Sequence, residues 1–254
     1  MKRRLLAVFA HPDDEAFGPG GTIAKYAAEG VEIHILSVTR GEEGDWDEKH
    51  KRSVQLSASS GQLVGRKRIQ HVREEELRRS AKILGVKRVE FLDFIDGQLC
   101  NAVYHQLAEK IIKKINTFEP HVVLTIDRLG VSGHLDHIAV SMITTYSFLK
   151  TKFPRKLYYH CLPREWYTRR MRNYFIYFPE GYPHDAITTR VDYARFWSTR
   201  KQAMQQHESQ AKDVRDVTKM YQMRPKRDHY ILQYFRGGKI QSGETDLFAG
   251  IDGW

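Results

Sequence analysis

The sequence predicts an α/β fold, a Rossmann-like and mostly parallel sheet with helices on both faces, in a single domain over residues 1–254. Apolar runs and helix-like periods alternate through the first 150 residues, which is typical of βαβ units. Several apolar runs are continuous rather than alternating, as in strands buried on both faces. No repeat, low-complexity tract or Pro/Gly-rich linker divides the 254 residues, a length that one large domain accommodates.

The first elements follow one another closely. Residues 5–10 are a continuous apolar run and predict the first strand. A helix over about 20–29 follows, ended by Gly30, and residues 32–38 predict the second strand. Residues 40–70 are rich in Gly, Ser, Gln and charged residues without a sustained period. We expect a long loop there, with room for one short helix, and loops of that length are often functional.

The rest of the βαβ core, 1–150, follows from apolar spacing and from Gly or Pro at element ends. The expected elements are a helix over 73–84, a strand over 89–92, a helix over 102–118, a strand over 121–126 and a helix over 134–148.

Residues 151–254 give weaker signals. We expect edge strands over 156–161 and 186–191 and a helix over 193–210. The remaining tail is expected to form a packing arm or a lid.

Composition places the chain among water-soluble proteins. Hydrophobic residues make up 41% and charged residues 28%, which is ordinary for a globular domain. Cys100 and Cys161 form no CxxC pattern, which favours a reducing compartment. The apolar run at 5–10 is too short for a signal peptide, and no stretch is long enough to span a bilayer. We therefore expect a cytoplasmic protein; the sequence leaves its oligomeric state, including a homo-oligomer, open.

The formal net charge of +10 is the exception in this composition. Three basic clusters contribute to it, at 66–68, 169–172 and 224–227. A solvated surface explains them most simply, and a site for an anionic substrate is the main alternative. We do not expect a nucleic-acid partner, because no recognition motif accompanies the charge; salt-sensitive binding that survives a metal chelator would revive that idea.

Two motifs carry the chemistry. His11-Pro12-Asp13-Asp14-Glu15 follows the first strand directly, and His134-Leu135-Asp136-His137 comes shortly after the strand at 121–126. Ligand sites in doubly wound sheets lie outside the carboxyl ends of the strands. If the two strands are close, His11, Asp14, His134 and His137 face one crevice.

The spacing within the motifs suits a metal. Pro12 keeps His11 extended, adjacent Asp13 and Asp14 point in different directions, and His134 and His137 are three apart at a helix start. Two imidazoles and one carboxylate, with a fourth position for water, form a catalytic zinc site. Either motif alone has a simpler explanation, as a surface His pair or a helix cap; it is their joint occurrence that favours a metal.

With these two motifs, the sequence resembles the LmbE-like (PIG-L) de-N-acetylase family. Nearly the whole chain takes part in the resemblance. The matching segments are AHPDDE at 10–15, TRGEEG at 39–44, REEELRRSAKILGV at 73–86, SGHLDHIAV at 132–140, KQAMQQHESQ at 201–210 and DLFAGI at 246–251.

The resemblance implies a fold, an activity and residue roles. Zinc ligands would be His11, Asp14 and His137, one zinc per chain, with other divalent metals as alternatives. Asp13 would be the general base. His134, oriented by Asp136, would stabilise the oxyanion or protonate the leaving amine. One more residue, Arg73, would contact a hydroxyl-rich or anionic substrate. The family's second motif usually has Pro where this chain has Leu135, which changes loop rigidity rather than ligands.

The expected function is therefore metal-dependent hydrolysis of the N-acetyl group of an N-acetylglucosamine-containing small molecule or glycoconjugate. A zinc amidase acting on a non-sugar N-acyl substrate is the alternative. Three other features stay open: the glycines at 18–21 as tight turns or a dinucleotide site, His207 in a second sphere or in helix packing, and the aromatic stretch 158–182 as core or as a sugar-stacking surface.

Overall fold

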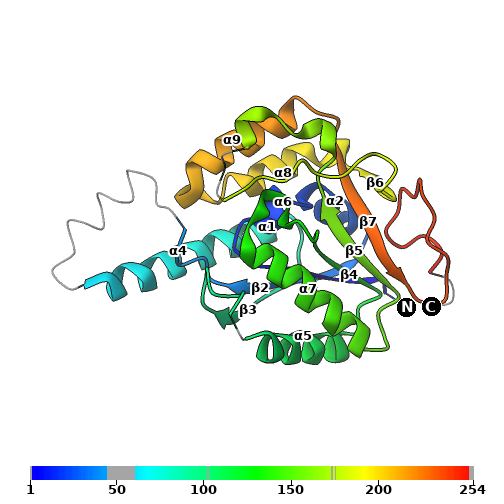
Figure 1. The fold of residues 1–254 in the computed structure, drawn as a ribbon, viewed down its shortest axis with the longest axis horizontal. Coiled ribbons are helices and arrows are strands. Elements are labelled where there is room, and N and C mark those ends of the chain that lie inside the picture. The colour runs from blue at the N-terminus through cyan, green and yellow to red at the C-terminus, as the bar shows by residue number, and fades with distance from the viewer. Residues whose placement is uncertain (1, 45–60, 102, 173, 175, 252–254) are drawn as a thin grey trace.

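The computed structural model describes residues 2–44, 61–101, 103–172, 174 and 176–251, apart from the side chains of 61–68 and 170. Its centre is a seven-stranded sheet in the order β3-β2-β1-β4-β5-β7-β6 (Figure 1). Strands β1 to β5 pair in parallel, whereas β7 pairs antiparallel with both β5 and β6. This confirms the predicted mostly parallel sheet.

The elements of the first half lie close to their predicted positions. Those predicted from apolar spacing are β1 (Arg4–Phe9), α2 (Gly20–Ala28), β2 (Glu32–Thr39), β3 (Arg88–Phe94), α5 (Tyr104–Phe118), β4 (Val122–Ile126) and α7 (Leu135–Lys150). Two short helices were not predicted, α1 (Asp14–Phe17) and α6 (Gly130–Gly133). Both directly follow a strand end, and both carry or precede a motif residue.

The expectation of a loop over 40–70 was wrong in its second part. Helix α4 runs from Gly61 to Ile83, so it begins twelve residues before the predicted start at Arg73. Gly61 and Gly65 are weak helix formers, and the segment lacks a sustained apolar period, which concealed the helix. Residues 45–60, the middle of the predicted loop, lie outside the described residues.

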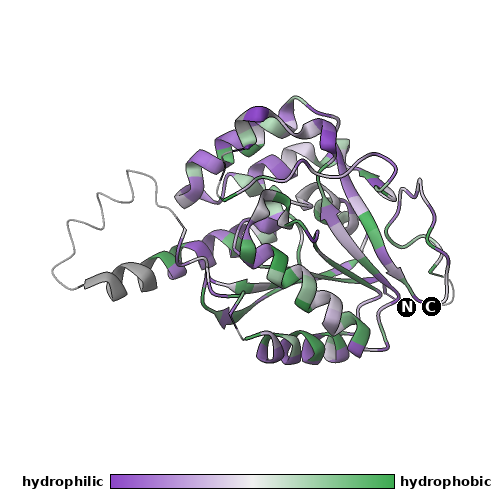
Figure 2. Cartoon of the chain, in the orientation of Figure 1, coloured by the Kyte–Doolittle hydropathy of each residue, from purple (hydrophilic) through white to green (hydrophobic). Residues whose placement is uncertain are grey.

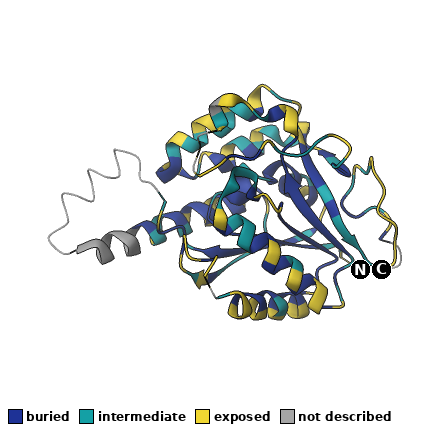
Figure 3. Cartoon of the chain, in the orientation of Figure 1, coloured by how far each residue is buried: buried dark blue, intermediate teal, exposed yellow. Residues whose placement is uncertain are grey.

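Helices cover both faces of the sheet, as predicted. One buried cluster joins Leu6 and Val8 of β1 to α5 and α7, and a second joins Leu5, Ala7 and Phe9 to α2, α8 (Trp197–Met204) and the C-terminal arm. Because successive side chains of a strand point to opposite faces, β1 contributes to both clusters. Figures 2 and 3 show these hydrophobic, buried strands beneath helices whose outer turns are more hydrophilic and exposed.

The last hundred residues depart most from prediction. Strand β5 (Lys156–Cys161) is not at an edge, because β7 (Arg227–Phe235) pairs with its free side. On this side of the sheet the edge strand is β6 (Thr189–Asp192). The predicted helix 193–210 is broken into α8 and flanking short 3₁₀ turns. A further helix, α9 (Ala211–Gln222), and β7 itself occupy part of the predicted tail.

A buried ion pair ties this C-terminal region to the first motif. The guanidinium of Arg200 on α8 lies 2.8 Å from the Asp228 carboxylate of β7, and both side chains are buried. Arg200 also donates to the backbone carbonyls of Ala16, Phe17 and Gly18. These are the carbonyls that the short helix α1 leaves without intrahelical partners, so the pair fixes the element that carries Asp14.

No helix in the described part of the chain is long and apolar enough to cross a bilayer. Both cysteines are free thiols; Cys161 is buried and Cys100 exposed.

Candidate metal and hydrolytic site

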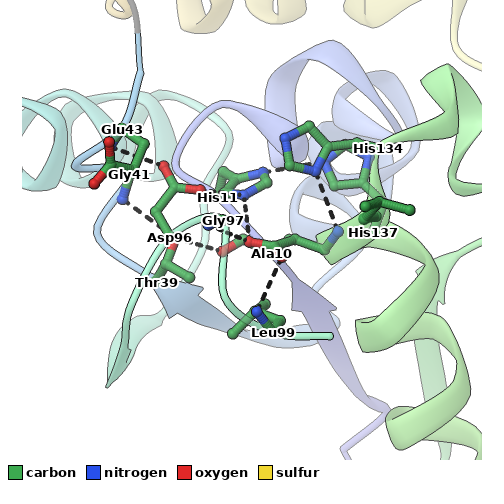
Figure 4. A network of polar contacts seen from close by, with 12 residues as sticks. Ala10, His11, Thr39, Gly41, Glu43, Asp96, Gly97, Leu99, His134 and His137 are labelled. Atoms are coloured by element: carbon green, nitrogen blue, oxygen red, sulfur yellow. Dashed lines mark hydrogen bonds and ion pairs between the residues drawn. The ribbon is translucent and has the colours of Figure 1, made fainter. Parts of the chain in front are cut away.

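The two motifs meet at the point where the order of strands reverses. β1 lies between β2 and β4, so the chain winds outward from it in both directions, and the carboxyl ends of β1 and β4 open a crevice there. His11 follows β1, and His134 and His137 follow β4. Figure 4 shows His11 between Asp96 on one side and His134 and His137 on the other. The predicted closeness of the two motifs is confirmed.

Three ligand atoms converge at this point. His11 Nδ1 lies 3.1 Å from His137 Nε2, and Asp14 Oδ1 lies 3.2 Å from the same His137 nitrogen. Two ligand atoms at zinc bonding distance in a tetrahedral site lie roughly 3.3 Å apart. Both distances from His137 Nε2 therefore fit neighbouring ligands of one zinc ion.

The remaining nitrogen of each imidazole is held from outside. His11 Nε2 lies 2.9 Å from Asp96 Oδ1 and 3.4 Å from Asp136 Oδ2. His137 Nδ1 lies 3.0 Å from the carbonyl oxygen of Gly130. An imidazole that donates its other N–H to a carboxylate or carbonyl presents an unprotonated nitrogen to a metal, so both rings are oriented for ligation.

Two other groups of ligand atoms lie close together. One comprises His11, His134 and His137, and the other His11, Asp96 and Asp136. In the second group, the two carboxylates engage His11 Nε2 and thereby serve as its outer partners. In the first group, His134 Nδ1 already accepts a hydrogen bond from the backbone N–H of Asp136 at 3.2 Å. Asp14 Oδ1 lies 3.2 Å from His137 Nε2, so we take His11, His137 and Asp14 as the candidate ligand set.

The adjacent residues Asp13 and Asp14 have opposite environments. Burial raises the pKa of Asp13 to about 7, although the charge of Arg73 opposes the shift. Burial also acts on Asp14, but the charge and hydrogen bond of His137 outweigh it and hold the Asp14 pKa below its usual range. Neighbouring carboxyls whose pKa values are driven apart are suited to different roles.

Backbone strain accompanies this divergence. Asp13 has φ 119° and ψ −27°, a conformation that a residue with a Cβ rarely adopts. Asp14 begins α1, and its Oδ2 accepts hydrogen bonds from the backbone N–H groups of Ala10 and His11 at 3.1 and 3.0 Å. The strain turns the two carboxylates to different sides, and such outliers gather at functional sites.

A buried hydrogen-bond network centred on Glu15 holds the backbone of Asp13. Glu15 accepts a hydrogen bond from the Asp13 backbone N–H at 3.1 Å, lies 2.7 Å from His207 Nε2, and accepts the hydroxyl of Ser80. Burial acts to lower the His207 pKa, but the charge of Glu15 outweighs it and raises that pKa. His207 therefore belongs to the second sphere of this site rather than to helix packing alone.

Arg73 is placed differently from our expectation of a substrate contact. Its side chain is 4% exposed and donates to Asp13 Oδ2 at 2.9 Å and to the carbonyl oxygens of Pro12 and Gly41 at 2.7 and 2.8 Å. A Cβ on Gly41 or Gly44 would overlap its guanidinium, so the TRGEEG loop closes around it. These contacts make Arg73 a positioning residue for Asp13.

Asp136 contacts His134 through its backbone N–H and directs its carboxylate elsewhere. The Asp136 side chain accepts the backbone N–H groups of Gly97 and Leu99 at 2.7 and 3.1 Å and lies against His11. Its contact with His134 is made by the backbone N–H. At the first turn of α7, the Asp136 carboxylate therefore faces the 97–99 loop and His11.

Two aspartates of the site were not found in the sequence. Asp96 follows β3, touches His11, and is held by the backbone N–H of Glu43 at 3.1 Å. Asp127 directly follows β4; burial raises its pKa to about 6, and Tyr182 donates to it at 3.2 Å. Both stand at carboxyl ends of strands, the signal that identified His11. The TRGEEG loop also serves this structure, since Glu42 accepts the Asp96 N–H at 3.1 Å.

Two open features of the sequence now have structural explanations. Gly20 and Gly21 begin α2, and a Cβ on Gly21 would overlap the ring of Tyr193, so close packing explains the glycines. Within the aromatic stretch, Tyr158, Tyr159, Trp166 and Phe178 are buried core, whereas Tyr174 and Tyr177 are exposed.

The chain shares its sequence pattern with deacetylases. Residues 6–147 match the family described as PIG-L, GlcNAc-PI de-N-acetylase. The chain is 30% identical to a 1D-myo-inositol 2-acetamido-2-deoxy-alpha-D-glucopyranoside deacetylase of Actinosynnema mirum, over 98% of each chain.

Solved structures share its fold. An N,N'-diacetylchitobiose deacetylase from Pyrococcus horikoshii aligns with a TM-score of 0.61 at 19% identity, over 91% of this chain and 84% of that one. The 4-carboxy-2-hydroxymuconate hydratase GalB of Pseudomonas putida aligns with a TM-score of 0.68 at 18% identity, over 93% and 98%. The family model matches more than half of the chain, and the Actinosynnema mirum deacetylase aligns with nearly all of it. The chain therefore belongs to the PIG-L family of GlcNAc-PI de-N-acetylases.

Proposed function

We propose that this protein is a zinc-dependent N-deacetylase that hydrolyses the acetamide of an N-acetylglucosamine-containing small molecule, releasing acetate and a free amine. The observation that carries the proposal is the convergence of His11 Nδ1, His137 Nε2 and Asp14 Oδ1 beside the strained, buried Asp13. Family membership and the named activity of the Actinosynnema mirum relative support the substrate class.

His11, Asp14 and His137 would hold the metal. When bound, zinc supplies Lewis acidity and a nucleophilic water near neutral pH. Asp13, Asp14, Asp96 and Asp136 place four carboxyl groups around three imidazoles and one guanidinium, a balance that favours a bound cation. We assign one zinc per chain, with iron or cobalt as alternatives for this donor set.

Asp13 is the general base in this proposal. A carboxylate with a pKa near 7 accepts a proton efficiently at neutral pH, and burial gives Asp13 that value. The carboxylate takes a proton from the attacking water as the C–O bond forms, and it later gives that proton to the amine nitrogen as the C–N bond breaks. Arg73 and Glu15 hold Asp13 by its side chain and its backbone N–H.

His134 stabilises the developing oxyanion. Its Nδ1 accepts the Asp136 N–H, so a neutral ring carries its proton on Nε2. Burial, followed by the charges of His11 and His137, lowers the His134 pKa to about 4, which keeps the ring neutral near pH 7. A preorganised N–H donor aimed at the acetamide oxygen stabilises charge that appears only in the transition state. Asp136 contributes by fixing the tautomer.

The test is acetate release from GlcNAc-α-inositol by the zinc-loaded protein, with release abolished by chelator and restored by zinc. Asp13→Asn should keep the metal and lower kcat about 10²–10⁴-fold, whereas the matched change Asp14→Asn should lose the metal. Metal analysis of both variants beside the rate assay separates the roles. Full metal occupancy in Asp14→Asn, or wild-type rates in Asp13→Asn, would contradict the assignment.

A zinc amidase acting on a non-sugar N-acyl group would use the same residues. N-acetyl-lysine and N-acetylglucosamine conjugates assayed side by side decide between them, and faster hydrolysis of the amino acid would favour the alternative. The free thiols of Cys100 and Cys161 agree with the cytoplasmic location that the sequence predicts.

A further inference from the structure

The three basic clusters of the sequence differ in what their side chains contact. The side chains of 66–68 lie outside the described residues. In the 224–227 cluster, Arg224 donates to the carbonyl of Trp166 at 3.0 Å and Lys226 to the carbonyl of Tyr221 at 2.9 Å, so these cations hold the backbone. In the 169–172 cluster, Arg169 and Arg172 instead line a cavity.

That cavity has a volume of about 640 Å³. It is lined by Tyr167, Arg169, Arg172, Tyr177 and Glu180, which all belong to the segment between β5 and β6. Two guanidinium groups, two phenol rings and one carboxylate therefore surround it. A volume of several hundred Å³ is typical of small-molecule sites.

The cavity is built on a fixed frame. Backbone hydrogen bonds join Arg164 to Tyr182 and Tyr182 to Leu162, at 2.8 and 2.9 Å, and close the segment at its base. Trp166 and Phe178 pack into a buried cluster with Leu162 and Tyr221. Each of these buried aromatics stands next in sequence to a tyrosine of the cavity, so the core contacts fix the positions of Tyr167 and Tyr177.

The same segment adjoins the hydrolytic site. Gly133, directly before His134, lies so close to the carbonyl oxygen of Tyr177 that a Cβ would overlap it. Tyr182 donates to Asp127 at the end of β4. The segment that lines the cavity therefore borders the hydrolytic site at the Gly133–His134 turn and at Asp127.

The charge of the cavity favours an anion. Arg169 and Arg172 form no ion pair with any described residue. Glu180 has a partner, since its carboxylate lies 4.0 Å from Nε of Arg164, a residue that does not line the cavity. Two guanidiniums with one partly compensated carboxylate leave net positive charge. Arginine side chains bind carboxylate and phosphate through charge-assisted, often bidentate hydrogen bonds.

We propose that this cavity is the aglycone subsite and that Arg169 and Arg172 bind a carboxylate or phosphate group carried by the aglycone of the amino sugar. The proposal rests on the proposed function for the sugar-bearing half of the substrate. It adds that the preferred substrates are anionic, with Tyr167 and Tyr177 as the walls against which the aglycone packs.

Three N-acetyl-α-glucosaminides test this: the methyl glycoside, the glycoside of 3-hydroxypropanoic acid, and the 1-phosphate. The wild-type protein should show a KM about tenfold or more lower for the anionic probes than for the methyl glycoside. Arg169→Gln/Arg172→Gln should remove that preference, leaving kcat and the neutral probe unchanged. Whichever anionic probe gives the lower KM identifies carboxylate or phosphate as the natural group.

A matched control is Lys87→Gln/Arg195→Gln, which removes the same charge from exposed positions elsewhere and should retain the preference. Calorimetric Kd values of the Asp13→Asn protein for the three probes repeat the comparison without turnover. Equal Kd values for neutral and anionic probes, or an equal loss in both double variants, would overturn the subsite. Absence of acetate release from all three probes would instead contradict the deacetylase function.

Discussion

Adjacent Asp13 and Asp14 acquire different chemistry from their backbone. Asp14 is the first residue of α1 and receives two backbone N–H groups, whereas Asp13 is held at φ 119° and faces Arg73. The pKa of one carboxyl is lowered and that of the other raised. In the proposed function, neighbouring residues of the same type thus serve as a metal ligand and as a base, at the cost of local strain.

Arg73 gives the first prediction at this scale. Arg73→Gln removes the only cation that the described residues place on the Asp13 carboxylate, and a broken buried pair destabilises a protein by about 3–5 kcal/mol. We expect a lower Tm, retained metal and a kcat reduced about tenfold or more, because Asp13 loses its orientation.

Arg73→Lys is the matched variant, since it keeps the charge but not the fork of donors. It should recover part of the Tm and part of kcat. Steady-state kinetics with metal analysis checks both variants. A pure rise in KM with unchanged kcat would show that Arg73 acts on the substrate, as the resemblance implied.

At the residue scale, sequence reasoning placed His11, Asp14, His134 and His137 in one crevice because they come after long apolar strands. The structure brings these side chains together. Asp96 was missed because β3 is only partly buried and its apolar run was short. The direction of the Asp136 carboxylate depends on the loop at 97–99, which contacts it across 37 and 39 residues of sequence; no local pattern encodes such a contact.

At the scale of elements, the connection that bears the second motif is a tightly packed turn. Gly130, Val131 and Gly133 all have positive φ, and Val131 does so despite its branched Cβ. The turn places the Gly130 carbonyl on His137 and Gly133 against Tyr177. It therefore connects the proposed metal ligand His137, the proposed oxyanion donor His134 and the proposed aglycone cavity.

Gly133→Ala should disturb all three. A Cβ at φ +76° is strained, which costs on the order of 1–3 kcal/mol, and it would also push Tyr177 away. We expect the lower stability to be accompanied by a loss in kcat/KM of up to about 100-fold, because small displacements of catalytic groups have effects of that size.

Gly30→Ala separates strain from contact. Gly30 has φ +81°, but nothing lies within 4 Å of its added Cβ. It should lose similar stability in urea unfolding and keep its kcat/KM. Equal kinetic losses in the two variants would mean that the Gly133–Tyr177 contact has no catalytic consequence.

Long-range pairing limited the prediction of elements. In α9, Val214, Val217 and Tyr221 have helical spacing. The helix was nevertheless missed, because most of the residues between them are charged. β7 pairs antiparallel with β5, more than sixty residues earlier in the chain, and separates it from the edge. Its exposed and buried positions follow no strict alternation. The βαβ half was predictable because, apart from the crossover from β3 to β4, strands that are consecutive in sequence pair in the sheet.

For the molecule as a whole, the fold does not decide the chemistry. A hydratase and a deacetylase both align with this chain at TM-scores above 0.6. Function is argued from the side chains at the strand ends. The sheet that positions them also buries several histidines: His121, His160 and His229 are 1, 2 and 8% exposed.

These histidines make the folded state sensitive to acid. Burial and then the charge of Arg4 lower the pKa of His121 to about 4, and its Nδ1 accepts the Arg4 backbone N–H at 2.9 Å. The unfolded chain has a histidine pKa of about 6.5, so it binds the proton first. The contribution of neutral His121 to stability is complete above pH 6.5, and it is lost as the pH falls from about 6.5 toward about 4.

His121→Asn keeps an acceptor for Arg4 and removes the titration. Between about pH 7 and pH 4.5, the urea-derived unfolding free energy of the wild type should fall more than that of this variant, by on the order of 1–3 kcal/mol. Protonation of carboxylates affects both proteins alike, so the difference reports the histidine. His71→Asn, at an exposed position of α4, should follow the wild type. Parallel stability curves for wild type and His121→Asn would show that His121 does not couple folding to pH.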